Sequence, residues 1–339
     1  MLDRAYGTLI GSAIGDGMGM PASFMTPDQI KKSYGKIVGF NKPSSEQIAH
    51  GSLNEGEITD DTEESIIIAS VLIEKSGFNR ELFVDKMREW AIKNKMLKTT
   101  VIGPSTRRFL TSIINGEDYI KAGRLGDTNG GAMRAAPIGI FHHEDIKMAT
   151  EDAFESAIVS HGSKPGAGST CAIAAAVSCA VEGKASIDKV MKSAIYGAHY
   201  GEENGYDIPA PSIEERIKLA MEVVDRNKDK SLDEVSKMLY RLIGAGMKSY
   251  ESIPLSLGVF YAGGGNYEEC LTAVINIGDD ADTNGSIVGA LCGAFKGASN
   301  IRDEWKSYIE NTNHIDFYKM AQDILSARNK IVEKIQTKN

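Results

Sequence analysis

Two segments of the chain, one near each end, carry a glycine at every fourth position. The glycines in question are Gly7, Gly11, Gly15, Gly19, Gly285, Gly289, Gly293 and Gly297. Each glycine inside a helix costs about 1 kcal/mol relative to alanine, so such a row makes sense where a second backbone must come close. The same spacing occurs in membrane helices, but Asp16 and Lys296 interrupt any apolar stretch of about 20 residues. The rows therefore predict two helices of a soluble fold that cross at short distance.

Nearly every long segment has the apolar spacing of a helix, and β-branched runs of period two are absent. A helix from Leu2 to Met18 is followed by a short one that opens at Thr26-Pro27-Asp28. Further helices are expected at about 59–76, 80–94, 104–115, 145–160, 169–183, 186–198, 212–227, 231–243, 252–262, 266–277, 283–297 and 316–336. Residues 35–58 and 126–137 are expected to be loops, and long loops of the first kind are often functional. The pattern predicts an all-α fold.

The composition of the 339 residues excludes several classes of protein. With 42% hydrophobic and 25% charged residues the chain is typical of a folded soluble protein. A net charge of −8 argues against a nucleic-acid-binding surface. The four cysteines lie in apolar contexts without a C-x-x-C pair, which is typical of buried thiols in a reducing compartment.

The N-terminus lacks the pattern of a signal peptide, so we expect a cytoplasmic protein with no membrane segment. No stretch resembles a linker, and we expect a single domain over residues 1–339.

Two acidic clusters stand at the starts of predicted helices. One is Thr59-Asp60-Asp61-Thr62-Glu63-Glu64, and the other is Asp279-Asp280-Ala281-Asp282-Thr283. Acidic residues are common in the first turn of a helix, because they interact favourably with the positive end of the helix dipole. This interaction would account for one or two of the acidic residues in each cluster. If the two helix starts converge, the crowded carboxylates must shift their pKa values or hold cations. Neither cluster has a His or Cys close by in the sequence. The ligands would then all be oxygen atoms, which favours Mg²⁺ or Mn²⁺ over Ca²⁺ and disfavours Zn²⁺.

Two other segments have features of a ligand-binding loop. Asn129-Gly130-Gly131 with Arg134 is a tight turn beside a cation, where glycine permits close approach of a ligand, although a purely structural turn is the simpler interpretation. The segment from His161 to Gly168 contains a His, a Lys and glycines before an expected helix start at Ser169. Free N–H groups there would suit phosphate or pyrophosphate. The alternative is a helix–loop–helix joint with Ser169 as the cap, in which His161 caps the preceding helix.

Taken together, these motifs resemble the ADP-ribosylglycohydrolase family, which includes ADP-ribosylarginine hydrolase, ADP-ribosylserine hydrolase and dinitrogenase reductase-activating glycohydrolase. The resemblance covers the whole chain. It rests on Gly7-x3-Gly11-x3-Gly15-Asp16-x2-Gly19, Thr59-Asp60-Asp61-Thr62, Asn129-Gly130-Gly131-Ala132-Met133-Arg134, Ser160-His161 and Asp280-Ala281-Asp282-Thr283. It implies a compact orthogonal multi-helix bundle with a binuclear Mg²⁺ or Mn²⁺ centre.

The resemblance also implies roles for individual residues. The implied metal ligands are Thr59, Asp60, Asp61, Asp280, Asp282 and Thr283. The implied ADP-ribose-binding residues are Asn129, Gly130, Gly131, Ala132, Met133, His161, Lys164, Gly166, Gly168 and Ser169, with Lys164, His161 and the loop N–H groups on the diphosphate. Asp279 departs from the family pattern, because many members have glycine at this position. Three roles are open for it: an outer partner of the metals, a local N-cap, or a cause of altered metal preference. The stretch from Gly197 to Arg216 matches best a bacterial subgroup whose substrates are poorly defined.

The function expected from this resemblance is metal-assisted hydrolysis of a glycosidic bond to the ribose of an ADP-ribosyl group, on a protein or a small molecule. Two divalent cations would hold the ribose hydroxyls and orient water. Asp61 is the leading candidate for general base, followed by Asp282. One alternative is a hydrolase of a free ribosylated or phosphoribosylated metabolite, which a narrow pocket would favour over an open groove. Another is a non-catalytic ADP-ribose-binding module.

Overall fold

The computed structural model describes residues 1–336, with side chains described as far as Lys330. It consists of helices and contains no β-strand among the described residues, which confirms the all-α prediction. The elements are α1 (Leu2–Gly19), η1 (Met20–Ala22), α2 (Pro27–Tyr34), α3 (Asp60–Lys75), α4 (Arg80–Lys93), η2 (Met96–Lys98), α5 (Pro104–Asn115), α6 (Tyr119–Gly123), α7 (Gly130–Met133), α8 (Ala136–Phe141), α9 (Ile146–Ala157), α10 (Lys164–Val181), α11 (Ile187–Asn204), α12 (Ile213–Asp225), α13 (Leu232–Ile243), α14 (Ser249–Ala262), α15 (Tyr267–Ile275), α16 (Ala281–Lys296), η3 (Ala298–Asn300), α17 (Asp303–Asn313) and α18 (Phe317–Gln336).

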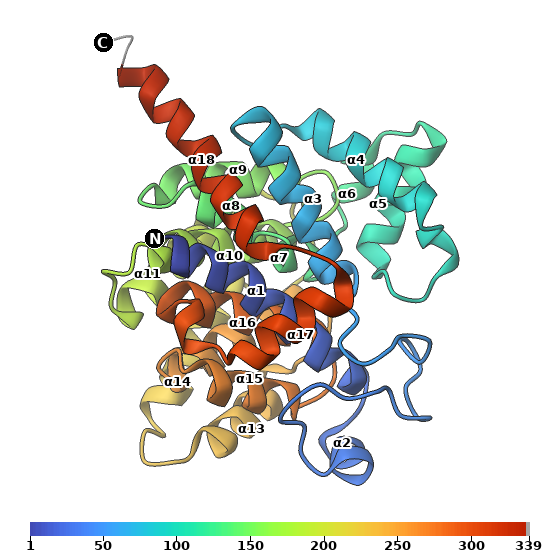
Figure 1. The fold of residues 1–339 in the computed structure, drawn as a ribbon, viewed down its shortest axis with the longest axis vertical. Helices are drawn as coiled ribbons and strands as arrows, with labels where there is room; N and C mark the ends of the chain where they lie inside the picture. The colour runs from blue at the N-terminus through green and yellow to red at the C-terminus, as the bar shows by residue number, and fades with distance from the viewer. Residues whose placement is uncertain (337–339) are drawn as a thin grey trace.

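Helices α1 and α16 pack backbone against backbone in the middle of the molecule (Figure 1). A Cβ atom added to Gly11 would lie 2.5 Å from the carbonyl oxygen of Gly289, and one added to Gly15 would lie 2.0 Å from that of Gly285. Gly7 faces Gly293 in the same way, so the two helices run antiparallel in fixed register. The predicted close crossing is confirmed for these positions.

The last glycine of each row is used differently. Gly19 packs against Ala281, while Gly297 follows the last residue of α16 with φ +90°, and its carbonyl carbon lies 2.8 Å from the Cβ position of Gly7. Because the helices are antiparallel, the C-terminal end of α1 lies beside the N-terminal end of α16. This arrangement carries Asp16 to the second acidic cluster.

Several predicted boundaries were wrong, most importantly around α10. This helix begins at Lys164 and not at 169, with Ser163 as its N-cap: the Ser163 hydroxyl accepts a hydrogen bond from the Gly166 N–H at 3.2 Å. Gly166 and Gly168 are therefore inside a helix, where they allow close packing: a Cβ on Gly166 would lie 2.3 Å from the Gly126 carbonyl oxygen. The interpretation of these glycines as loop residues failed because their contacts are remote in sequence.

Other differences are smaller. The expected loop at 126–137 contains α7 and the start of α8, α11 continues to Asn204, and α6 and α17 were not predicted. Gly263 to Gly265 connect α14 and α15. The buried apolar side chains form one core cluster, which runs from Ala5 to Ala327 in the described residues. Residues 337–339 lie outside the described residues, and the single domain over 1–339 stays a prediction.

Two predictions from composition can be compared with the fold. All four cysteines are buried and free, as expected. Across residues 1–336, none of the helices combines the length and apolar character needed to cross a membrane.

Candidate active site

The N-terminal ends of α3 and α16 open into one pocket, although about 220 residues separate them in the sequence. The free space that the centre of a water molecule can occupy in this pocket is about 40 Å³. The lining residues are Phe24, His50, Asp60, Asp61, Val101, Gly103, Thr106, Thr128, Asn129, Gly130, Met133, Met247, Asp280, Asp282 and Thr283. Residues 60 and 282 thus face the same space.

Asp16 fixes the start of α3 against α1. Its Oδ2 accepts hydrogen bonds from the Thr59 N–H at 2.9 Å, the Thr62 N–H at 3.2 Å and the Thr62 hydroxyl at 2.6 Å. Its Oδ1 accepts from the Thr59 hydroxyl at 2.8 Å. Burial raises the pKa of Asp16 to about 6, against the lowering effect of these donors. Asp16 belongs to the N-terminal motif but was not predicted as a site residue; its place between Gly15 and Gly19 was the available signal.

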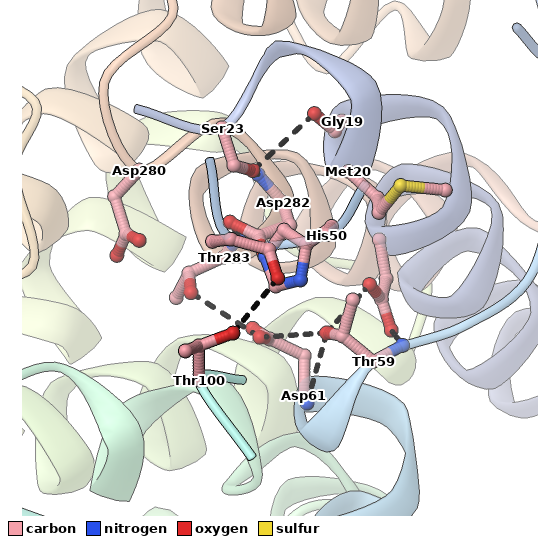
Figure 2. A network of polar contacts seen from close by, with 12 residues as sticks. Gly19, Met20, Ser23, His50, Thr59, Asp61, Thr100, Asp280, Asp282 and Thr283 are labelled. Carbon is pink, nitrogen blue, oxygen red and sulfur yellow. Dashed lines mark hydrogen bonds and ion pairs between the residues drawn. The ribbon is translucent and has the colours of Figure 1, made fainter. Parts of the chain in front are cut away.

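A threonine pair joins the two clusters through Asp61. Asp61 Oδ2 lies 3.2 Å from the Thr59 hydroxyl and 3.3 Å from the Thr283 hydroxyl, which belongs to α16 (Figure 2). The second oxygen, Asp61 Oδ1, is buried and has no hydrogen-bond partner among the described residues. Because an unpaired buried carboxylate oxygen is costly, this atom indicates a place for a bound cation or water.

Asp282 is held by a histidine that the sequence analysis missed. His50 Nε2 lies 2.8 Å from Asp282 Oδ2, and both side chains are almost completely buried. The pKa of His50 is raised: burial lowers it, but the hydrogen bond and charge of Asp282 outweigh burial. Conversely, burial acts to raise the pKa of Asp282, and His50 brings it below its usual value. His50 was missed because it is remote in sequence, and the 35–58 loop brings it to Asp282. The all-oxygen ligand set stays a prediction.

Asp280 contacts the Asn129 loop. The Asn129 amide donates to Asp280 Oδ2 at 2.5 Å and to the Ser252 hydroxyl at 3.0 Å. The Ser252 hydroxyl in turn donates to Asn284 Oδ1 at 2.7 Å. Burial and the neighbouring charge of Asp282 raise the pKa of Asp280 to about 7. These bonds link α7, α14 and α16 around the pocket.

Asp279 does not share this space. Its backbone has φ +55°, its N–H donates to the Met25 carbonyl at 2.8 Å, and its carbonyl accepts from the Phe24 N–H at 2.5 Å. The N-cap residue of α16 is Asp280, so Asp279 is not a local N-cap. It shapes the turn that leads into α16.

Comparison with known proteins gives the family of this chain. The profile of the ADP-ribosylglycohydrolase family matches residues 1–337. The chain belongs to the ADP-ribosylglycohydrolase family. YegU of Escherichia coli (strain K12) is 28% identical over 96% of this chain and 97% of its own length. ADP-ribosylarginine hydrolase Tri1 of Serratia proteamaculans is 24% identical over 90% of this chain and 74% of its own length.

A solved structure supports the fold separately. The structure described as an ADP-ribosylglycohydrolase-related protein complex superposes with a TM-score of 0.70 at 22% identity, covering 96% of this chain and 98% of that one. At this identity the likeness establishes the ADP-ribosylglycohydrolase fold. As a member of this family of glycohydrolases, the chain is classed with hydrolases.

The carboxylates and threonine hydroxyls of the pocket are oxygen donors of the kind that Mg²⁺ and Mn²⁺ prefer. Burial, then the surrounding carboxylates, raise the pKa values of Asp60 and Asp61 well above the usual range, as expected when like charges share a space that a cation would neutralise. Among the described residues, no three His, Cys, Asp or Glu side chains already converge as a metal site. Binding would therefore involve the threonine hydroxyls or rotation of the carboxylates.

The predicted substrate-binding residues divide into two groups. Asn129, Gly130 and Met133 line the pocket. Those outside its lining are Gly131, Ala132, His161, Lys164, Gly166, Gly168 and Ser169. Ser169 lies inside α10, where its hydroxyl donates to the Gly166 carbonyl at 2.8 Å. Because no helix starts at Ser169, both the anion site expected at that position and the alternative role of Ser169 as a helix cap were wrong. Substrate contact by the second group stays a prediction.

Proposed function

We propose that this protein hydrolyses the glycosidic bond between the anomeric carbon of a ribosyl group, such as that of ADP-ribose, and its leaving group. The observation that carries the proposal is the meeting of Asp61 and Thr283 at 3.3 Å, from two helix starts far apart in sequence, beside an unpaired oxygen of Asp61. Membership of the ADP-ribosylglycohydrolase family supports the same reaction class. The name of the Tri1 relative favours an ADP-ribosylated substrate.

We further propose that Thr59, Asp60, Asp61, Asp280, Asp282 and Thr283 hold two divalent cations, Mg²⁺ or Mn²⁺. When bound, the cations would orient the ribose hydroxyls and water and increase the acidity of that water. The oxygen-rich donor set is the one these cations prefer. His50 would keep Asp282 in one orientation through the 2.8 Å contact, as partners of metal ligands commonly do.

The carboxylates of the pocket supply the remaining chemistry. In the reaction, the bond from the anomeric carbon to the leaving group breaks, and that carbon gains the oxygen of water. Asp61 Oδ1, which has no partner in the described part of the chain, would accept a proton from the water, and the leaving group takes up a proton. The negative charge of the pocket favours the positive charge that develops on the sugar ring.

The experiment is a substrate panel with the purified protein in Mg²⁺ or Mn²⁺. The panel contains ADP-ribosyl-arginine, ADP-ribosyl-serine, O-acetyl-ADP-ribose and free ribosides, and Asp60→Ala and Asp282→Ala are assayed in parallel. Turnover that EDTA and both substitutions abolish supports the proposal. Turnover that survives both treatments removes the metals from the mechanism, and tight ADP-ribose binding without any turnover indicates a non-catalytic binding module.

A further inference from the structure

A buried chain of hydrogen bonds runs from the core to the wall of the pocket. Arg134 Nη1 donates to Glu64 Oε2 at 2.6 Å, and Arg134 Nη2 donates to the Ser160 hydroxyl at 2.7 Å. The Ser160 hydroxyl lies 2.8 Å from His161 Nδ1, and His161 Nε2 lies 3.1 Å from the Thr128 hydroxyl. All five side chains are buried. Thr128 is the member of this chain that lines the pocket.

The arginine sets the direction of the hydrogen bonds. A guanidinium group has only donors, so the Ser160 oxygen must accept from Arg134. Among the described residues, the hydrogen of the Ser160 hydroxyl then has one acceptor within hydrogen-bond distance, which is His161 Nδ1. A hydrogen on Nδ1 would leave this buried hydroxyl hydrogen without an acceptor, and that is costly. His161 Nδ1 therefore carries no hydrogen.

The charge state of His161 agrees with this direction. Burial, then the charges of Arg134 and Arg108, lower the pKa of His161 well below its usual value. A neutral imidazole with no hydrogen on Nδ1 carries its hydrogen on Nε2. His161 Nε2 therefore donates to the Thr128 oxygen at 3.1 Å. Gly130 leaves room for the ring, because a Cβ atom added there would lie 2.9 Å from Nε2.

Thr128 is left with a hydrogen to donate. Its oxygen accepts from His161, and the described residues provide no acceptor for its own hydrogen. Two other donors of the lining, the Asn129 amide and the Thr283 hydroxyl, are already bound to aspartates. The aspartates of the pocket can accept hydrogen bonds from ribose hydroxyls, whereas a phosphate oxygen brings no hydrogen and requires a donor. The Thr128 hydroxyl meets that requirement.

We infer that Thr128 is a specificity-determining residue whose hydroxyl donates a hydrogen bond to a phosphate oxygen of the substrate, and that His161 is the positioning residue that orients this hydroxyl. The inference rests on the proposed function and names one contact within the same site. It also changes the role that the resemblance implied for His161. That ring lies outside the pocket lining and acts through Thr128 instead of binding the diphosphate itself.

The first test measures ADP-ribose binding by isothermal titration in Mg²⁺. Thr128→Val keeps the shape of the side chain and removes its hydroxyl, so it should weaken ADP-ribose binding about tenfold, as loss of a hydrogen bond to a charged group does. Thr128→Ser keeps the hydroxyl and should bind within about twofold of the wild type. Thr150→Val is the matched control, because the buried Thr150 hydroxyl donates to the Ile146 carbonyl at 2.7 Å within α9. It should bind ADP-ribose like the wild type.

A second probe, adenosine, tests the assignment to a phosphate. Adenosine carries no phosphate and should compete equally weakly against ADP-ribose in the wild type and in Thr128→Val. Unchanged ADP-ribose affinity in Thr128→Val, or an equal loss of affinity for adenosine, overturns the inference and leaves the proposed function intact. Absence of ADP-ribose binding together with absence of turnover across the substrate panel overturns both.

Two measurements test the role of His161. NMR of the ring nitrogens in the unaltered protein at pH 7 should show a hydrogen on Nε2 and none on Nδ1, and the reverse overturns the inference. His161→Phe should weaken ADP-ribose binding about fivefold in the wild type but less than about twofold in Thr128→Val, because its effect passes through Thr128. Equal losses in the two backgrounds would show that His161 contacts the substrate itself, which also overturns the inference.

Discussion

Gly15 in α1 and Gly285 in α16 pack so closely that a methyl group on either would collide with the backbone of the other. This contact is one of a row of contacts along two antiparallel helices. The antiparallel packing places Asp16 beside the N-terminus of α16. The arrangement explains why a site made of residues from both ends of the chain is held by glycines that carry no chemistry.

The crossing predicts the effect of adding that methyl group. Gly15→Ala should lower the free energy of unfolding by about 3 kcal/mol or more, because backbone atoms cannot shift as a side chain could. Gly39 has no heavy atom within 4 Å of the same methyl position, so Gly39→Ala is the matched control and should change stability little. Urea denaturation measures both, and equal stability of the two variants would contradict the close packing.

Cation binding should stabilise the folded protein. At a concentration about 100 times Kd, a ligand that binds only the native state adds about 2.7 kcal/mol, or about 5 °C in Tm for a chain of this size. We expect Mg²⁺ or Mn²⁺ to produce such a shift in differential scanning fluorimetry and EDTA to reverse it. Asp60→Ala should fold and show no shift; a shift that persists in this variant would place the cation elsewhere.

Asp282 and Asp279 are neighbouring aspartates whose variants together test where the cations bind. Asp282 lines the pocket, while Asp279 lies outside it. Asp282→Asn should lower metal affinity and kcat/KM by about 100-fold, whereas Asp279→Asn should stay within about threefold of the wild type. Isothermal titration with Mn²⁺ gives the affinity without an activity assay. Similar losses in both variants would show that the overall negative charge of the region, and not the pocket, governs metal binding.

His50 should act by positioning Asp282. His50→Ala removes the 2.8 Å contact and should reduce metal affinity or activity by about 10- to 100-fold, as loss of a ligand's supporting partner commonly does. His143, whose Nδ1 lies 3.1 Å from the Ile140 carbonyl, provides the control. His143→Ala should retain both properties. Unchanged Mn²⁺ affinity and activity in His50→Ala would contradict this role.

The buried His161 predicts a dependence of stability on pH. Its pKa lies below the ordinary value of 6.5, so the unfolded chain takes up a proton as the pH falls through that value while the folded protein does not. Its contribution to stability is therefore present above about pH 6.5 and is lost at about 1.4 kcal/mol per pH unit below it. His161→Gln should remove this part of the acid destabilisation. Parallel stability curves for wild type and variant between pH 7 and pH 5 would refute it.

The all-α class, the glycine crossing and the two acidic helix starts follow from the sequence because each depends on local spacing. A glycine every fourth residue lies on one helix face whatever surrounds it, and carboxylates before an apolar run mark a helix start. These features needed no knowledge of remote contacts. The antiparallel register, Gly7 with Gly293 and Gly15 with Gly285, was not predicted and comes from the structure.

Only the tertiary structure decided which remote groups complete the site. It brought His50 from a loop to Asp282, gave the Thr59 and Thr62 donors to Asp16, and placed Gly166 inside a helix. It also buried His161 as a neutral ring and directed Lys164 to Asp207, away from the pocket. Partner choice and desolvation depend on which surfaces the folded chain brings together, and no local pattern in the sequence encodes that.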